Sequence, residues 1–277
     1  TTVGKEMGNF AVRLAQQRKK VANVDICGKF NGAVGNLNAH YAVWPQLPWV
    51  NITQEFVEKS LGIKYSKYST QIEFHDYISE LFDNVQRFNT ILLDFDRDMW
   101  SYVSLNYWKL VTIAGEVGSS TMPHKVNPID FENSEGNLGL ANSTFHHLST
   151  KLLISRFQRD LSDSTVLRNI GVGCSYSLIA YQSTLRGLSK ITLNKSVVED
   201  DLKNRWELLA EPAQTFMRAN DVPDAYERLK ALTRGKSSVK QADIVELLTK
   251  LENPQNKIDV HRLSLLTPLS YVGAAPE

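Results

Sequence analysis

The sequence predicts an all-α fold, an elongated bundle of long helices followed by a smaller helical domain. Three observations carry this prediction. From Gln71 to about Trp108, apolar residues recur at alternating spacings of four and three positions, and no glycine or proline interrupts them. Two later stretches, 128–152 and 164–192, repeat this spacing. No stretch has the pattern that would predict a β-strand instead.

The first part of the chain predicts one helix, a polar loop and a short helix. Residues 5–26 carry an apolar stripe among basic residues, and Gly28 ends this helix. The loop KFNGAVGNLNAH at 29–40 is rich in glycine and asparagine. It is either a set of ordinary turns or the wall of a polar pocket. Two prolines keep 41–50 irregular, and a short helix follows at about 53–61.

The helix from Gln71 to Trp108 would be longer than roughly 40 Å and would need partners along its whole length. We expect the helices at 128–152 and 164–192 to be these partners. Each helix carries a seam, meaning a line of apolar residues along one side, and we expect subunit association to bury any seam left exposed. The three predicted seams are Phe74, Ile78, Leu81, Val85, Phe88, Leu92, Phe95, Met99 and Tyr102; Leu138, Ala141, Phe145, Leu148 and Leu152; and Leu167, Ile170, Cys174, Leu178, Tyr181, Leu185 and Leu188.

Beyond residue 193 the predicted helices become shorter and the seven-residue repeat fades. We therefore expect two domains, a central bundle over 1–192 and a C-terminal helical domain over 193–277. The predicted helices of the second domain are 198–210, 212–219, 224–233 and 240–251.

The composition limits the possible partners. The 277 residues include 31 basic and 30 acidic side chains, a net charge of +1, so no general field attracts nucleic acid or a membrane. Cys27 and Cys174 lack metal-site spacing, and so few cysteines suit a reducing compartment such as the cytoplasm. The chain begins without methionine and enters a helical pattern at once, so we expect a piece of a longer polypeptide.

The stretch GSSTMPHKVNPIDFEN, 118–133, combines three features that suit a small anion. Gly118, Ser119 and Ser120 form a hydroxyl-rich loop, and Lys125 supplies a cation. Asn127 reads as the N-cap and Pro128 as the first residue of a helix. A helix start with these neighbours could hold an anion while a proton moves. The alternative is an ordinary surface loop before a helix.

A second candidate anion site lies in SRFQRDLSDSTVLRN, 155–169. Arg156 and Arg159 precede a run of capping residues, and Ser164 and Arg168 would share one face at the start of the next helix. Arginines beside a hydroxyl suit a phosphate group. In the alternative interpretation, Arg159 and Arg168 form surface ion pairs with Asp160 and Asp163.

The run GSSTMPHKVNP resembles the signature loop of the fumarase/aspartase superfamily, GSSxMPxKxNP, at every fixed position. Its continuation IDFENSEGNLGLAN, together with RDLSDSTVLRN and TRGK at 233–236, is similar to the bacterial-type adenylosuccinate lyase family. The resemblance runs nearly end to end. It implies an all-helical subunit in a homotetramer with shared active sites, and no metal or organic cofactor.

The resemblance also implies roles for individual residues. Ser119 would be the general base, and Lys125 and Asn127 would stabilise the charge that develops on the substrate. Gln71 and Asn133 match amide contacts to substrate. The family's general-acid histidine and N-terminal domain precede the point where this chain starts, so we expect the chain alone to turn over poorly. The residues that match nucleotide-binding positions are Arg159, Ser164, Thr165 and Arg168.

The implied reaction is elimination of fumarate from adenylosuccinate, leaving AMP, and from the succinyl-carboxamide ribotide of purine synthesis. Two alternatives stay open. One is a sibling lyase acting on argininosuccinate, fumarate or aspartate, although the phosphate-suited segment 156–168 argues against it. The other is a structural protein that reuses the bundle without catalysis, against which the intact Ser119, Lys125 and Asn127 argue.

Overall fold

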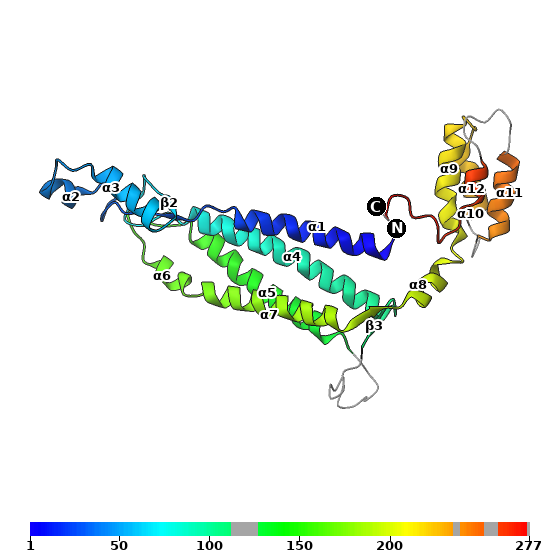
Figure 1. Cartoon of the computed structure of the whole chain (residues 1–277), viewed down its shortest axis with the longest axis horizontal. Coiled ribbons are helices and arrows are strands. Elements are labelled where there is room, and N and C mark those ends of the chain that lie inside the picture. Colours follow the sequence, from blue (N-terminus) through cyan, green and yellow to red (C-terminus); the bar gives the residue numbers. More distant parts are fainter. Residues whose placement is uncertain (112–126, 235–238, 252–259, 276–277) are drawn as a thin grey trace. The chain divides into compact units, whose positions relative to one another are not determined.

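A computed structural model describes residues 1–111, 127–234, 239–251 and 260–275 (Figure 1). The chain divides into two compact units. The bundle unit comprises Asn9–Val103 and Leu110–Ile191, and the C-terminal unit comprises Thr1–Gly8, Ser104–Lys109 and Thr192–Glu277. The predicted division into a central bundle domain over 1–192 and a C-terminal helical domain over 193–277 stays a prediction.

Four long helices dominate the bundle unit and confirm the all-α prediction. They are α1 (Val3–Ala22, whose first residues belong to the C-terminal unit), α4 (Asp76–Ser104), α5 (Ile129–Lys151) and α7 (Ile170–Ser189). Successive long helices run in opposite directions (Figure 1). With 29 residues, α4 extends for roughly 43 Å, in agreement with the predicted length.

Shorter elements connect the long helices. Among the described residues the strands have only two or three residues each, too few to show a pattern in the sequence, and β1 pairs with β2 in parallel. The other pair is β3 with β4. These elements are β1 (Cys27–Gly28), α2 (Asn38–Val43), α3 (Trp49–Glu55), a π-helical turn (Phe56–Ser60), β2 (Lys64–Tyr65), β3 (Trp108–Leu110), α6 (Ser162–Leu167) and β4 (Ile191–Leu193).

Several predicted helix boundaries differ from the structure, and two of the differences have a clear local cause. The long helix begins at Asp76 and not at Gln71, because His75 adopts a φ of 64°, outside the helical region, while its N–H donates to Glu73. The predicted helix 164–192 is interrupted between α6 and α7. There the Asn169 backbone N–H bonds the Val166 carbonyl in a tighter turn, and its side-chain amide donates to the Thr165 carbonyl.

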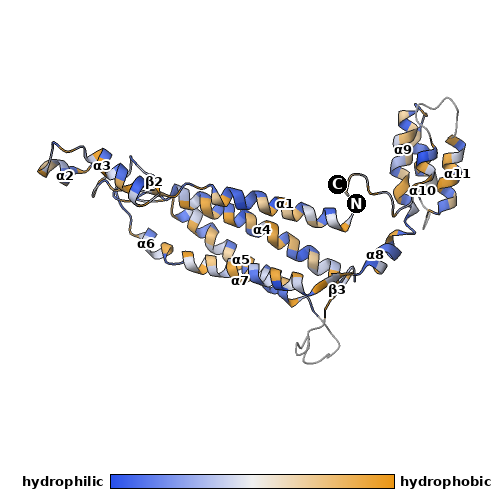
Figure 2. Ribbon diagram, viewed as in Figure 1, coloured by the Kyte–Doolittle hydropathy of each residue, from blue (hydrophilic) through white to orange (hydrophobic). Residues whose placement is uncertain are grey.

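The interface between α5 and α7 is built from large residues on one helix and small residues on the other. The predicted seam of α5, from Leu138 to Leu152, is confirmed, since all five of its residues are buried. The predicted seam of α7 was wrong, because most of its residues do not face the other helices of the chain. Leu178 and Leu185 are exposed, and hydrophobic positions recur along this helix (Figure 2). The residues of α7 that are buried are Gly173, Ser177, Ala180, Ser183, Thr184 and Gly187.

Aromatic rings connect all four long helices. Phe10 of α1 packs edge-on against Phe95 of α4, with ring centroids 5.3 Å apart, and Phe95 packs against Phe131 of α5 at 6.5 Å. The Phe131 ring in turn lies on Gly187 of α7, where a Cβ would come within 2.9 Å of it. The absence of a side chain at Gly187 therefore sets how closely α5 and α7 approach.

Buried polar contacts accompany this apolar packing between α4, α5 and α7. Asn89 donates to Ser177 Oγ at 3.0 Å and accepts from the Tyr181 hydroxyl. Seven residues further along both α4 and α7, Thr184 Oγ1 lies 2.9 Å from Asp96 Oδ1 and 2.8 Å from Ser134 Oγ. Because a shift in register would leave these buried polar groups unpaired, the hydrogen bonds favour a single register of the three helices.

The C-terminal unit has its own apolar core, centred on Phe216, Met217, Ile244 and Leu248. None of the helices that the structure describes in either unit is both long and apolar enough to cross a membrane. The helices of this unit are α8 (Lys195–Leu202), a 3₁₀ turn (Trp206–Leu209), α9 (Ala210–Ala219), α10 (Ala225–Thr233), α11 (Gln241–Leu251) and α12 (His261–Ser264).

Substitution of Gly173 by alanine tests the packing of α7. A Cβ there would lie 2.8 Å from the ring of Phe145, which is 1% exposed and cannot swing away. We expect Gly173→Ala to lower the free energy of unfolding by about 1–3 kcal/mol relative to Gly171→Ala, measured by urea denaturation. Gly171 is the matched control, since a Cβ there meets nothing within 4 Å and alanine favours the helix. Equal stability of the two variants would contradict the packing.

Asp96 makes the stability of the bundle depend on pH. Burial raises the pKa of this carboxyl to about 7, although hydrogen bonds to Ser134 and Thr184 oppose the change. Its Oδ2 is buried without a partner among the described residues. The folded state therefore holds a proton that the unfolded state loses near pH 4. The free energy of unfolding should fall between about pH 4 and pH 7, by about 4 kcal/mol from this group.

Asp96→Asn should remove most of this decrease, and Asp94→Asn, an exposed position on the same helix, should keep it. Urea denaturation from pH 5 to pH 8 measures the difference between the two variants. An unchanged slope in Asp96→Asn would show that the carboxyl is ionised in the folded chain.

Candidate active site

The predicted site residues fall into two groups, one at each end of α5. Asn127 and Asn133 lie at its start, while Gln71 and the segment 155–168 lie beyond its end. Gly118, Ser119 and Lys125, on which the predicted catalytic role depends, lie outside the residues that the structure describes.

The start of α5 differs by one residue from the prediction. Pro128, and not Asn127, is the N-cap, and its carbonyl accepts the first helical N–H groups, those of Phe131 and Glu132. Asn127 is half-buried and directly precedes this cap. It therefore keeps its place at the junction between the signature loop and the helix, although it is not the N-cap.

An ion cluster fixes the first turn of α5. Asp130 accepts from Arg186 Nε through Oδ1 and from Lys190 Nζ through Oδ2, both at 2.8 Å. Burial alone would raise the pKa of Asp130, but these two cations outweigh it and hold the pKa below its usual value. Because both cations belong to the C-terminal end of α7, the cluster holds this end of α7 against the start of α5.

Asn133 lies one turn further along α5, on the exposed side of the helix. Its Nδ2 donates to Ser183 Oγ on α7 at 2.6 Å, and its Oδ1 accepts from Asn137 at 3.1 Å. Both atoms of the amide are thus held by neighbours within the chain. A substrate that used Asn133 would have to share or replace these hydrogen bonds.

In the predicted phosphate-binding segment, 155–169, acidic residues bind arginines and backbone N–H groups of the same segment. Asp160 accepts the Ser162 N–H and the Arg156 guanidinium, and these contacts hold its pKa far below the usual range. Arg159 Nη2 lies 3.6 Å from Asp163, so the ion-pair interpretation holds for Arg159. The backbone N–H groups of Ser162 and Ser164, at the start of α6, therefore donate to carboxylates of the same segment. The predicted phosphate-binding role of the segment stays a prediction.

The residues of this segment that could still meet a ligand are Ser164, Thr165 and Arg168. The Ser164 hydroxyl donates to the Leu161 carbonyl at 2.8 Å, whereas Thr165 is exposed. Arg168 is the C-cap of α6, one turn from Ser164, and is exposed. In contrast to Arg159, Arg168 makes no ion pair with any residue that the structure describes.

No local sequence pattern indicates that Lys29 organises the loop that carries Gln71. Its Nζ donates to the carbonyls of Gly32 at 2.7 Å, Thr70 at 3.3 Å and Gln71 at 2.6 Å. Burial lowers the pKa of Lys29. The Gln71 N–H in turn donates to the Gln158 carbonyl at 3.4 Å. Lys29 therefore connects the polar loop at 29–40, Gln71 and the arginine segment.

The glycine- and asparagine-rich loop at 29–40 packs against the same segment. Asn31 is 2% exposed and shares two hydrogen bonds with Ser69, and a Cβ on Gly35 would come within 2.1 Å of the Ser69 carbonyl. Its two interpretations were turns or the wall of a pocket. The described contacts of Asn31 make it a structural residue of the loop.

The two groups of site residues are far apart within one chain. The helix between Asn133 and Lys151 alone spans roughly 27 Å, and α6 lies near the end of the bundle where α5 stops (Figure 1). A small substrate cannot touch both groups of a single chain. Among the described residues, no three His, Cys, Asp or Glu side chains gather closely enough to hold a metal ion.

Comparison with known proteins identifies the family. Residues 1–141, half of the chain, match a family model described as lyase. The chain belongs to this lyase family. Residues 155–272 match a second family model, described as adenylosuccinate lyase C-terminal. The family resemblance inferred from the signature loop is therefore confirmed.

Curated relatives within the family are similar along the whole chain. The adenylosuccinate lyase of Haemophilus influenzae is 58% identical over 277 residues, which are 100% of this chain and 60% of the relative. That of Escherichia coli strain K12 is 56% identical over 275 residues, 99% of this chain and 59% of the relative. The chain thus spans about 60% of the length of these members of the lyase family.

The fold of the lyase family is also found in a distant solved structure. The crystal structure of 3-carboxy-cis,cis-muconate lactonizing enzyme from Pseudomonas putida matches with a TM-score of 0.69 over 99% of this chain and 61% of that protein. The sequence identity is 17%, so this match supports the helical fold alone.

Removal of the Lys29 ammonium should loosen the loop that carries Gln71. Lys29→Met leaves the carbonyls of Gly32, Thr70 and Gln71 without their shared donor, and we expect unfolding to become easier by about 1–3 kcal/mol. Hydrogen exchange at the Gln71 amide should accelerate. Lys67→Met is the control, because Lys67 is exposed. Unchanged exchange in Lys29→Met would mean that the ammonium does not hold this loop.

Proposed function

We propose that the chain forms part of an adenylosuccinate lyase. Such an enzyme eliminates fumarate from adenylosuccinate, leaving AMP, and from the succinyl-carboxamide ribotide of purine synthesis. The observation that carries this proposal is the 56–58% identity to adenylosuccinate lyases over nearly the whole chain. The exposed Arg168 supports a substrate with a phosphate group, because a guanidinium suits its several acceptor oxygens.

The elimination breaks one C–H bond and one C–N bond. In the proposed mechanism Ser119 takes the proton from the carbon next to the one that carries nitrogen. The carbanion delocalises into the adjacent carboxylate, where Lys125 and Asn127 stabilise the charge. Its electron pair then forms the C=C bond of fumarate while the nitrogen leaves and receives a proton. By the family resemblance, a histidine gives this proton.

We further propose that several copies of the chain build each site in a homotetramer. The distance between the two ends of α5 supports this arrangement, because the Asn133 end of one chain would need the Arg168 end of another. The exposed apolar residues of α7 supply a surface for such association. The proposed enzyme acts in the cytoplasm, in keeping with its free cysteines, and needs no bound cofactor. The exposed apolar residues are Val172, Leu178, Ile179, Leu185 and Leu188.

The substrate and the base can be tested together in a polypeptide of the relatives' full length that carries this sequence. Fumarate release should occur with adenylosuccinate and the succinyl-carboxamide ribotide, and not with argininosuccinate. Ser119→Ala should lower kcat by about 10²–10⁴ while AMP binding is kept, since only proton abstraction is lost.

Thr121→Ala is the control for that experiment, because Thr121 occupies a variable position of the signature loop, and it should keep kcat within a few-fold. Turnover of argininosuccinate alone would support the sibling lyase. Activity with none of the substrates in the unaltered protein would favour a structural role. Full activity of Ser119→Ala would refute the assignment of the base.

A further inference from the structure

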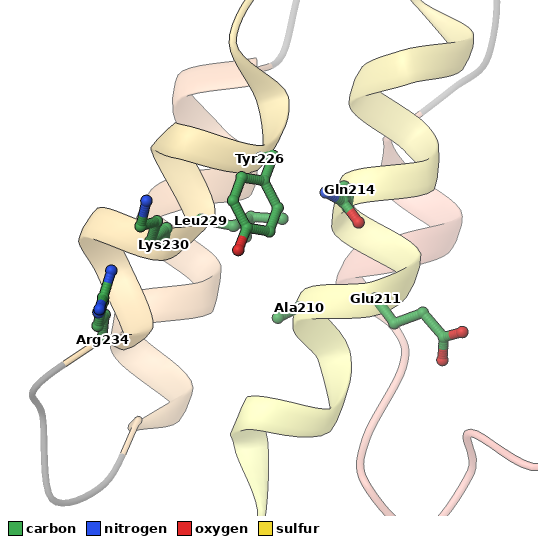
Figure 3. A pocket seen from close by; sticks show the side chains of 7 residues that line it. All are labelled: Ala210, Glu211, Gln214, Tyr226, Leu229, Lys230 and Arg234. Carbon is green, nitrogen blue, oxygen red and sulfur yellow. The ribbon is translucent and has the colours of Figure 1, made fainter.

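A cleft in the C-terminal unit lies between α9 and α10, and none of the residues that the proposed reaction uses lines it. Its volume is about 570 Å³, within the range of small-molecule sites. Gln214 and Ala210 line it from α9, and Tyr226 and Leu229 line it from α10 (Figure 3).

The cleft offers a planar surface for a ligand. The Tyr226 ring projects into the space between the two helices (Figure 3), and the residue is 57% exposed. Leu229, which is buried, and Ala210 add apolar surface beside the ring. Aromatic side chains with an exposed face stack against the bases of nucleotides and tolerate any base. The Gln214 amide, directed toward the same space from α9, has both a donor and an acceptor for the edge of such a base.

The rim of the cleft is positively charged. Lys230 lies in the last turn of α10, and Arg234 follows as the C-cap, with its backbone N–H bonded to the Lys230 carbonyl. The Lys230 ammonium is 5.6 Å from the centroid of the Tyr226 ring. Arg234 has no ion-pair partner among the residues that the structure describes. Lys230 pairs with Glu227 at 3.2 Å in an exposed i,i+3 contact, which is weak enough for a phosphate to displace.

The remaining acidic residue of the cleft does not oppose an anion. The Glu211 carboxylate accepts the Tyr271 hydroxyl at 2.8 Å, and its side chain points away from Tyr226 (Figure 3). The cleft therefore combines an aromatic face, an amide and two adjacent cations. A nucleoside monophosphate carries the matching groups, a flat base with polar edges joined through a sugar to a dianion.

We propose that this cleft is a second nucleotide site, which binds a nucleoside monophosphate with its phosphate on Lys230 and Arg234 and its base against Tyr226. Arg234 belongs to the segment TRGK at 233–236, which helped to identify the family. The proposal concerns residues separate from the predicted substrate contacts, so it stands or fails independently of the proposed reaction.

Photolabelling locates the site directly. The chain is irradiated with 8-azidoadenosine monophosphate, digested and analysed by mass spectrometry. We expect label on the α10 peptide that contains Tyr226, and competition by AMP but not by adenosine or inorganic phosphate at the same concentration. The double substitution Lys230→Gln with Arg234→Gln should reduce this labelling at least tenfold. Arg228→Gln, an exposed arginine of α10 outside the cleft, should leave it unchanged.

Two further measurements keep the outcome decisive. Circular dichroism shows whether the double variant is folded, and Arg234→Lys, which keeps the charge, should retain most of the label. Label confined to the peptide of α6 and Arg168 would overturn the second site while supporting the proposed substrate site. Equal labelling of the α10 peptide in the unaltered chain and in the double variant would also overturn it.

Discussion

The bundle depends on the contact between the aromatic rings of α5 and the glycines of α7. Phe131 and Phe145 occupy the space that side chains at Gly187 and Gly173 would fill. Since both rings are almost completely buried, they have no other place in the chain. This contact sets the separation and the register of the two helices. The residues attached to their ends, Asn127 before α5 and the arginine segment after it, take their positions from that register.

Close approach of the backbones also brings short polar side chains within hydrogen-bonding distance. Ser134 of α5, Thr184 of α7 and Asp96 of α4 meet in the interior because α7 presents small residues there. The cost is a carboxyl whose second oxygen has no partner among the described residues. Burial raises the pKa of this carboxyl to about 7, so that it is protonated in mildly acidic solution. At the end of the same interface, Asp130 is charged instead, because Lys190 and Arg186 both reach it. The same residue type thus serves as a neutral group in one place and an ion in another.

Hydrophobic periodicity predicted the helical fold and the inward face of α5, where large apolar residues are the buried ones. It failed on α7, because the residues that face α5 there are small and carry little hydrophobic signal, while leucines lie on the exposed side. The interactions of Lys29 depend on carbonyls some forty positions away and could not be predicted from the local sequence. The catalytic roles of Ser119, Lys125 and Asn127 were predicted from the signature motif of the family, and hydrophobic spacing contributed nothing to them.

The pairing of phenylalanine with glycine also has a consequence for the order in which the bundle assembles. The chain between Phe145 and Gly173 is half as long as the chain between Phe131 and Gly187, so closing the shorter loop costs about 0.6 kcal/mol less conformational entropy. Folding is then favoured to start where α5 turns into α7 and to proceed toward Phe131. The end of α5 that follows the signature loop would be the last to lock in place, and therefore the first to open.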